Sequence, residues 1–348
     1  MGKNKKVAII GHFGGTENIL DGQTIKTKIL YDELKTATNW SIKKVDTYYK
    51  NKKPFKLLLS TFMTLFSTRS IIILLSGNGM KFYFPILSLF SRIFKTRVYH
   101  DVIGGNLDTY VEKYPKYKKY LNSFKVNWVE TQSLQMKLEQ CGITNCDVIP
   151  NFKRLSIARI DENVSVRTFN FCIFSRVMKE KGIEIAIEAI EKINKEANEE
   201  ICKLDIFGRI DEGYKDRFEQ VLNDATSSIE YKGMVPYDKS VEAIRDYYAL
   251  LFPTFWRGEG FPGTIVDAFS AGLPVIASDW NCNGEIVENK VNGILYPNDE
   301  IDDLYQAIKW MINNSDNIAS MRLNCVETAR RYQPDEYIDK IVRYIGEK

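Results

Sequence analysis

The sequence predicts an α/β protein built from two doubly wound, Rossmann-like domains. Its 348 residues suit two domains of ordinary size, and an apolar fraction of 44% with 27% charged residues is enough to bury two cores. In both halves, short apolar runs rich in β-branched residues alternate with segments of helical length. This alternation is typical of parallel sheets that are covered by helices on both faces.

The first domain is expected to span residues 1–152 and the second to span residues 153–330. Strand-like runs in the first domain lie at 7–10, 41–46, 70–75, 96–100, 126–130 and 147–150. The runs in the second lie at 169–174, 204–207, 229–233, 250–254, 274–278 and 293–297. A last helix within residues 331–348 is expected to pack back on the first domain. Because open α/β sheets bind ligands at the carboxyl ends of their strands, we expect the two domains to face each other across a cleft.

Several kinds of protein are made improbable by what the sequence lacks. There are two histidines, His12 and His100, and no D-x-D motif, so that no metal and no bound cofactor are expected. The six cysteines include no C-x-x-C pair and predict free thiols in a reducing compartment. No apolar run reaches the roughly 18 residues that a spanning helix needs, and the start has no secretory signal. The expected location is cytoplasmic.

Charge is distributed unevenly along the chain. Residues 1–150 carry 23 Lys and Arg against 11 Asp and Glu, a net charge of +12, whereas residues 151–348 have a net charge of −9. Nucleic acid and an anionic membrane are the two obvious partners of a basic half. Its aromatic residues fall at helical core spacing, not on a stacking platform, which argues against nucleic acid.

The most informative segment is RGEGFPGTIVDAFSAGLPVIASD, residues 257–279. Seven residues separate Glu259 from Asp267, and between them a turn leads into a helix. The turn consists of Gly260, Phe261, Pro262, Gly263 and Thr264. Unpaired N–H groups at a helix N-terminus attract anions, so that the turn is expected to hold a diphosphate beside two carboxylates that can bind sugar hydroxyls. The alternative is a plain connector with two solvated acids.

A second motif, SRVMKEKG, follows the strand-like run at 169–174. Arg176 and Lys181 both lie at the expected carboxyl end of that strand. A guanidinium binds phosphate through two parallel hydrogen bonds and an ammonium acts as a point charge. Taken alone, an Arg and a Lys in a loop are more often simply solvated.

Together these motifs resemble the retaining glycosyltransferases of family four, bacterial surface-polysaccharide enzymes among them, which have the two-domain GT-B fold. The likeness rests on R-x4-K-G at 176–182, a strand ending in Gly233, E-G-F at 259–261 and AGLPVIAS at 271–278. It runs through most of residues 169–297, and VIPNF at 148–152 is similar to the family's segment between domains. The first half matches more loosely, through Gly14, Gly15, residues 22–24 and His100.

The resemblance implies a role for each matching residue. Arg176 and Lys181 would bind the donor diphosphate, Glu259 would contact the transferred sugar, and Asp267 would hold the ribose. The backbone of residues 261–264 would contact the diphosphate and sugar, and Val235 would lie near the base. The departing phosphate would deprotonate the acceptor hydroxyl, so that no protein nucleophile is expected.

Three positions depart from the family pattern: Asp267 stands where Glu is usual, Pro262 lengthens the usual GFG, and Phe152 replaces a Gly. In the first domain, Gly14 and Gly15 do not complete G-x-G-x-x-G, which argues against a dinucleotide cofactor. The resemblance would put their loop opposite the donor phosphates. His100 is expected to end its strand and to contact or polarise a sugar, with a structural role as the alternative.

The basic half also contains two apolar helices flanked by lysines. Lys50, Lys52, Lys53 and Lys56 precede or begin the first of them, and Lys81, Arg92 and Lys95 lie along the second. Basic side chains around broad apolar faces suit helices that lie on an anionic lipid surface. The alternative is that these helices only cover the sheet.

The sequence therefore predicts a retaining hexosyltransferase that uses a nucleotide-diphosphate sugar, with a UDP-sugar favoured by the resemblance. The expected acceptor is a lipid-linked glycan of polysaccharide biosynthesis, reached by peripheral contact with the inner face of the plasma membrane. Two alternatives remain: a nucleotide-sugar epimerase on the same fold, which would need acid and base groups such as Glu17, His100 and Asp101, and a non-catalytic nucleotide-binding subunit.

Overall fold

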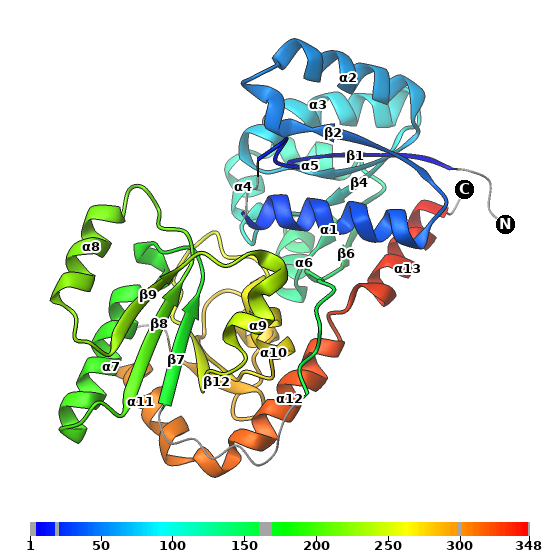
Figure 1. The fold of residues 1–348 in the computed structure, drawn as a ribbon. Coiled ribbons are helices and arrows are strands. Elements are labelled where there is room, and N and C mark those ends of the chain that lie inside the picture. The colour runs from blue at the N-terminus through cyan, green and yellow to red at the C-terminus, as the bar shows by residue number, and fades with distance from the viewer. Residues whose placement is uncertain (1–4, 18–20, 160–168, 298–300, 347–348) are drawn as a thin grey trace. The chain divides into compact units, whose positions relative to one another are not determined.

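The computed structural model describes residues 5–17, 21–159, 169–297 and 301–346. Contacts divide the chain into two compact units. Figure 1 draws the first mainly in blue to cyan, with its C-terminal helix in red, and the second mainly in green to orange. Unit 1 consists of Met1–Phe152, Gly258–Phe261 and Pro334–Lys348, and unit 2 of Lys153–Arg257 and Pro262–Gln333. The short segment Gly258–Phe261 thus groups with unit 1, although the residues on either side of it belong to unit 2.

Unit 1 is built on a parallel sheet of six strands. In spatial order they are β2 (Ser41–Asp46), β1 (Lys6–Gly11), β3 (Ser70–Leu74), β4 (Arg97–Asp101), β5 (Val126–Val129) and β6 (Cys146–Val148). The strands β1 and β3 are buried along almost their whole length, as is usual where helices cover both faces.

Helices cover both faces of this sheet because alternate strand residues point to opposite sides. Val7 and Ile9 pack with α1 (Gly22–Ala37) and α13 (Pro334–Gly346). Ala8 and Ile10 belong to a second core with the remaining helices. These are α2 (Pro54–Ser67), α3 (Gly77–Ile93), α4 (Leu107–Lys113), α5 (Lys116–Leu121) and α6 (Gln132–Gln140).

Unit 2 repeats the plan with a second parallel six-stranded sheet. In spatial order its strands are β12 (Gly293–Tyr296), β11 (Val275–Ser278), β10 (Ala249–Phe252), β7 (Phe169–Phe174), β8 (Cys202–Phe207) and β9 (Ile229–Gly233). Its helices are α7 (Ile183–Ala197), α8 (Lys215–Asp224), α9 (Ser240–Ile244), α10 (Gly263–Ser270), α11 (Ile301–Asn313) and α12 (Ile318–Arg330). The predicted class, two doubly wound parallel sheets, is confirmed.

Among the carboxyl strand ends that differ from those that the sequence predicts, two change the position of a charged residue. Strand β4 continues through Asp101, so that His100 lies within the strand. Strand β5 ends at Val129, so that Glu130 is the first residue beyond its carboxyl end. In the described part of the chain, no helix is long and apolar enough to cross a membrane.

Candidate functional site

The order of the strands in unit 2 locates its binding edge. The first strand of the unit, β7, lies beside the fourth, β10, and the chain winds away from this pair in both directions. Loops diverge at such a switch point, and ligands of doubly wound sheets bind there, outside the carboxyl ends of the strands. The two motifs that the sequence singles out follow β7 and β10.

The loop after β7 carries the two predicted phosphate-binding cations. Arg176 is exposed and forms an ion pair with Asp211, whose oxygen lies 3.1 Å from the guanidinium nitrogen. Lys181 is half-buried, with its ammonium 5.3 Å from the centre of the Phe252 ring at the end of β10. The surface pair on Arg176 contributes little stability and leaves the guanidinium open to solvent, where an anion can reach it.

The loop after β10 runs beside the loop after β7 and leads into α10. The N–H of Phe255 donates to the carbonyl of Glu180 at 2.9 Å. The hydroxyl of Thr264, in the first turn of α10, donates to the carbonyl of Phe174 at 2.6 Å. These bonds hold the N-terminus of α10 at the carboxyl end of β7. Helix N-termini carry partial positive charge, so that α10 adds to the field of the two cations.

Asp267 lies one turn inside α10 and is almost completely buried. Its two carboxylate oxygens accept hydrogen bonds from the ammonium of Lys153, at 2.8 and 3.0 Å. Burial raises the pKa of Asp267, and the attraction of Lys153 opposes that rise. The sequence analysis did not identify Lys153, because it lies 114 residues from its partner and belongs to no motif.

The residue before the turn, Glu259, groups with unit 1 together with Gly260 and Phe261, whereas Pro262 and the α10 residues group with unit 2. The buried N–H of Phe261 donates to a carboxylate oxygen of Glu130 at 3.2 Å. The predicted Glu259-to-Asp267 motif is therefore divided between two sets of contacts. Sequence spacing alone could not indicate this.

In unit 1 the loop after β1 is fastened to the end of β2. The N–H groups of Phe13 and Gly15 each donate to a carboxylate oxygen of Asp46 at 2.9 Å. Gly14 is buried and Gly15 exposed, both with positive φ. The loop thus has a defined shape, and the roles of Gly14 and Gly15 at a ligand stay predictions.

The position of His100 differs from the strand-end position that the sequence predicts. Its side chain is completely buried and lies against the rings of Phe84 and Phe124. Nδ1 lies 3.1 Å from the side-chain oxygen of Asn127, and Nε2 has no hydrogen-bond partner among the described residues. Burial lowers the pKa of His100 to about 4, so that the ring is neutral at pH 7. Because β4 continues through Asp101, His100 lies within the strand, and its side chain packs in the core on the covered face of the sheet.

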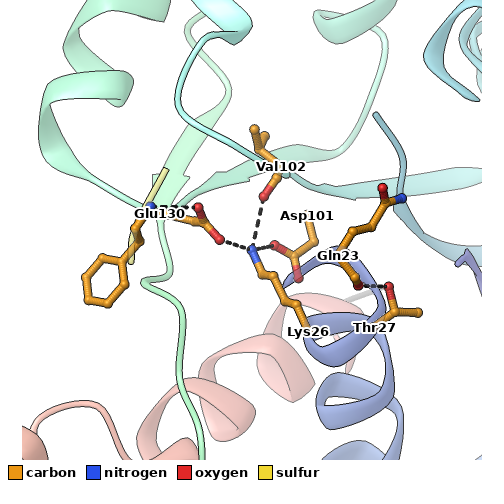
Figure 2. Close-up of polar contacts among 7 residues, drawn as sticks. Gln23, Lys26, Thr27, Asp101, Val102 and Glu130 are labelled. Atoms are coloured by element: carbon orange, nitrogen blue, oxygen red, sulfur yellow. Dashed lines mark hydrogen bonds and ion pairs between the residues drawn. The ribbon is translucent and has the colours of Figure 1, made fainter. Parts of the chain in front are cut away.

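A buried cluster of charges that the sequence analysis did not identify lies at the carboxyl ends of β4 and β5 (Figure 2). The ammonium of Lys26, on α1, lies 2.7 Å from Asp101 and 2.8 Å from Glu130, and donates to the carbonyl of Val102 at 3.0 Å. All three side chains are less than a tenth exposed. Gln23 donates to the carbonyl of Leu74, which fastens the same turn of α1 to β3.

The ionisation of this cluster follows from burial and from its own charges. Burial alone would lower the pKa of Lys26, but the attraction of Asp101 and Glu130 outweighs it and raises that pKa. Burial raises the pKa of Asp101 to about 6, against the attraction of Lys26. At pH 7 Lys26 and Asp101 are therefore both charged in the interior of unit 1.

The remaining predicted contact, Val235, is half-buried two residues beyond β9. Among the residues that the structure describes, no group of three or more His, Cys, Asp and Glu side chains could hold a metal ion.

Comparison with known proteins relates the second half of the chain to glycosyltransferases. Residues 168–314 match the family model described as glycosyl transferases group 1. An uncharacterized glycosyltransferase of Methanocaldococcus jannaschii is 29% identical over 165 residues, which are 47% of this chain and 44% of that protein. A poly(ribitol-phosphate) alpha-N-acetylglucosaminyltransferase of Staphylococcus aureus is 25% identical over 210 residues, 58% of this chain and 40% of that one. The alignments thus span less than half the length of these relatives.

Solved structures resemble the whole chain. Anabaena HepE, in complex with UDP and glucose, has a TM-score of 0.71 at 15% identity and covers 98% of this chain and 99% of its own. Sucrose-phosphate synthase of Thermosynechococcus elongatus has a TM-score of 0.79 at 14% identity, with 97% and 98% covered. With the two parallel six-stranded sheets, these neighbours confirm the predicted GT-B fold of two Rossmann-like domains.

Proposed function

We propose that the protein is a glycosyltransferase that takes a sugar from a UDP-sugar. The observation that carries this proposal is the switch point of unit 2. There, Arg176, Lys181 and the N-terminus of α10 lie on neighbouring strand ends, within the region that matches glycosyl transferases group 1. Two cations and a helix N-terminus suit a diphosphate, whose negative charge grows as the sugar leaves.

In this proposal, Arg176 and Lys181 stabilise the leaving UDP, and the carboxylate of Glu259 contacts the transferred sugar. Asp267 holds the ribose hydroxyls with Lys153 beside it. The acceptor hydroxyl loses its proton to the departing phosphate, the sugar is transferred with retention, and no metal takes part. The roles of Gly14, Gly15 and Val235 at the donor stay proposals of the same kind.

The choice of a UDP-sugar, and of a hexose or related sugar, is supported by proteins of similar fold or sequence. HepE is solved with UDP and glucose, and the S. aureus relative is named as an N-acetylglucosaminyltransferase. UDP-glucose and UDP-N-acetylglucosamine are therefore the first donors to test.

We also propose a lipid-linked acceptor, reached from a membrane surface. Helix α2 supports this because its apolar side faces outward. Its side chains that face the interior are Thr61, Thr64 and Leu65. Its exposed side chains are Phe55, Leu58, Leu59, Phe62, Met63 and Phe66. These recur every three or four residues and so form one stripe along the helix.

Helix α3 continues the apolar surface. The ring of Phe66 lies 5.3 Å from that of Phe90 and 5.8 Å from that of Phe94, which joins the two helices side by side (Figure 1). Phe82, Leu89 and Ile93 are also exposed. An apolar patch of this extent on a monomer marks an interaction site.

The charges around this patch favour an anionic bilayer as the occupant. Residues 47–100 contain nine Lys and Arg and no Asp or Glu. Each basic residue near an anionic surface contributes about 1 kcal/mol, and the attraction is screened beyond roughly 10 Å at 0.1 M salt. This combination of aromatic residues and uncompensated positive charge supports peripheral attachment at the cytoplasmic face of a membrane.

The activity can be tested in two steps. A thermal-shift screen with UDP, GDP, dTDP and CMP sugars identifies the donor, since a ligand at a hundredfold excess over its Kd stabilises the native state by about 2.7 kcal/mol. UDP release with alkyl glycoside acceptors then measures transfer, and NMR of the product gives the anomeric configuration. A donor that is epimerised without an acceptor would identify an epimerase, and the absence of any binding would refute the proposal.

Membrane attachment can be tested by co-sedimentation with vesicles of phosphatidylcholine, with and without phosphatidylglycerol. We expect binding only to anionic vesicles, loss of binding at high salt, and loss in the double variant Phe55→Glu, Phe66→Glu. Met136→Glu is a control because Met136 is an exposed apolar side chain on α6, outside this patch. Equal, negligible binding to both vesicle types at low salt would contradict the proposal.

A further inference from the structure

The buried cluster of Lys26, Asp101 and Glu130 is the feature of unit 1 that the proposed reaction does not use. Its members come from α1, from β4 and from the residue after β5, and one of them, Glu130, contacts the segment Gly258–Phe261. A buried charge cluster is costly unless its geometry is well satisfied, and such clusters are best attested as devices that specify one arrangement of the chain.

Both carboxylate oxygens of Glu130 accept a hydrogen bond. Oε1 accepts from the Lys26 ammonium at 2.8 Å, and Oε2 accepts from the N–H of Phe261 at 3.2 Å. Lys26 in turn donates to the carbonyl of Val102 and lies 2.7 Å from Asp101. Lys26 therefore fixes the position of the Glu130 carboxylate through one oxygen, and the other oxygen accepts from the backbone of the loop.

Close backbone packing holds the same loop from the other side. A Cβ atom on Gly105 would lie 2.2 Å from the carbonyl oxygen of Glu259. A Cβ atom on Gly260 would lie 2.7 Å from the Glu130 carboxylate and 3.0 Å from the Cα of Gly104. Only glycine fits at these two positions without a shift of the loop.

We infer that Glu130 is a positioning residue that holds the segment Gly258–Phe261, and with it the backbone of Glu259, in one place. The hydrogen bond from Lys26 orients the Glu130 carboxylate, and Gly104 and Gly105 lie in close backbone contact with the loop. The consequence for catalysis rests on the proposed function, because it requires Glu259 to contact the transferred sugar. A displacement of about 1 Å in such a group can lower turnover on the order of 100-fold.

The experiment compares hydrogen exchange in the intact chain for three variants. Glu130→Gln replaces the oxygen pair by an amide of the same shape, which cannot serve both Lys26 and Phe261. Gly105→Ala pushes on the Glu259 carbonyl and leaves the charges in place, so that it tests the loop even where the first variant does not fold. Asp147→Asn is the control, because Asp147 is a carboxylate of unit 1 that pairs with Lys340 at 2.8 Å away from the loop.

We expect amides of peptides covering residues 259–263 to exchange about tenfold faster or more in Glu130→Gln and Gly105→Ala, and at the native rate in Asp147→Asn. With the donor found by the screen, kcat should fall about 10- to 100-fold in both loop variants while the donor KM changes less than about threefold. Native exchange in both folded loop variants would overturn the inference.

The two readouts also separate this inference from the proposed function. Exchange needs no substrate, so that a loop released in both variants supports the positioning role even where the wild-type protein transfers no sugar, an outcome that would refute the proposed function alone. Active protein with a released loop and unchanged kcat would overturn the link to Glu259.

Discussion

The strand ends of the two units use charge in opposite ways. In unit 2, the cations Arg176 and Lys181 stand at a switch point, one exposed and one half-buried, with the N-terminus of α10 beside them. In unit 1, Lys26 stands at an equivalent edge but is buried and surrounded by Asp101, Glu130 and a backbone carbonyl. In the first arrangement the Arg176 guanidinium is exposed to solvent, whereas in the second the Lys26 ammonium is buried against two carboxylates.

This difference separates residues that can bind a ligand from residues that stabilise the fold. A cation that an incoming diphosphate is to use must keep donors available, and a pair with Asp211 at the surface is weak enough to be exchanged. A buried cation that is paired with two carboxylates cannot bind a ligand without breaking these pairs. Substitutions of the ligand-binding cations should therefore lower activity, whereas substitutions in buried charge pairs should lower stability.

The largest effect on stability is expected at the buried pair of unit 2. Lys153→Met leaves the Asp267 carboxylate buried without its partner, which should lower the free energy of unfolding by about 3–5 kcal/mol. Lys192→Met is the control, because Lys192 pairs with Asp302 at the surface and such pairs contribute less than about 1 kcal/mol. Urea unfolding measures both. Equal midpoints for the two variants would show that Lys153 and Asp267 are not a buried pair in solution.

The largest effect on activity alone is expected at Lys181. Lys181→Ala should lower turnover at least about 100-fold, since a charge stabiliser at a developing anion has this order of effect, and should leave the unfolding midpoint near that of the native protein. The matched control is Lys215→Ala, another lysine of unit 2, whose partner Glu219 lies one helical turn away on α8. Transfer at a near-normal rate by Lys181→Ala would remove this residue from the proposed site.

A smaller effect is expected in the pH dependence of stability. Burial lowers the pKa of His100 to about 4. Between about pH 6.5 and pH 4, the imidazole therefore binds a proton in the unfolded chain but not in the folded chain. The stability that neutral His100 contributes is present above pH 6.5 and is lost as the pH falls toward 4. Asp101, with its pKa raised to about 6, acts in the opposite direction: its contribution grows as the pH falls through 6.

Replacing His100 should therefore leave the contribution of Asp101 to the pH dependence of stability. In His100→Gln the loss of stability between pH 6.5 and 4 should shrink by on the order of 1–3 kcal/mol relative to the native protein, as measured by urea unfolding at several pH values. Asp101→Asn should change the slope in the opposite sense. An unchanged slope in His100→Gln would mean that the ring is protonated within the fold.

The sequence predicts those features that depend on residues close together in the chain. The periodicity of apolar runs predicted both sheets, and the spacing of Arg176, Lys181 and Glu259 located the loops after β7 and β10. It did not predict that Lys153 pairs with Asp267 or that Lys26 pairs with Glu130, because the partners are 114 and 104 residues apart and no motif contains both. It misplaced His100 because β4 continues through Asp101, so that His100 lies within the strand, on a face that is covered by Phe84 and Phe124.

We propose that unit 2 binds a nucleotide diphosphate through Arg176, whereas the buried charges of unit 1 bind no ligand. Isothermal titration of UDP into the native protein, Arg176→Ala and Glu130→Gln tests it most directly. We expect UDP to bind the native protein, to bind Arg176→Ala about tenfold more weakly or worse because one charge-assisted contact is lost, and to bind Glu130→Gln with nearly native affinity. Native affinity in Arg176→Ala, with a loss in Glu130→Gln, would contradict the account.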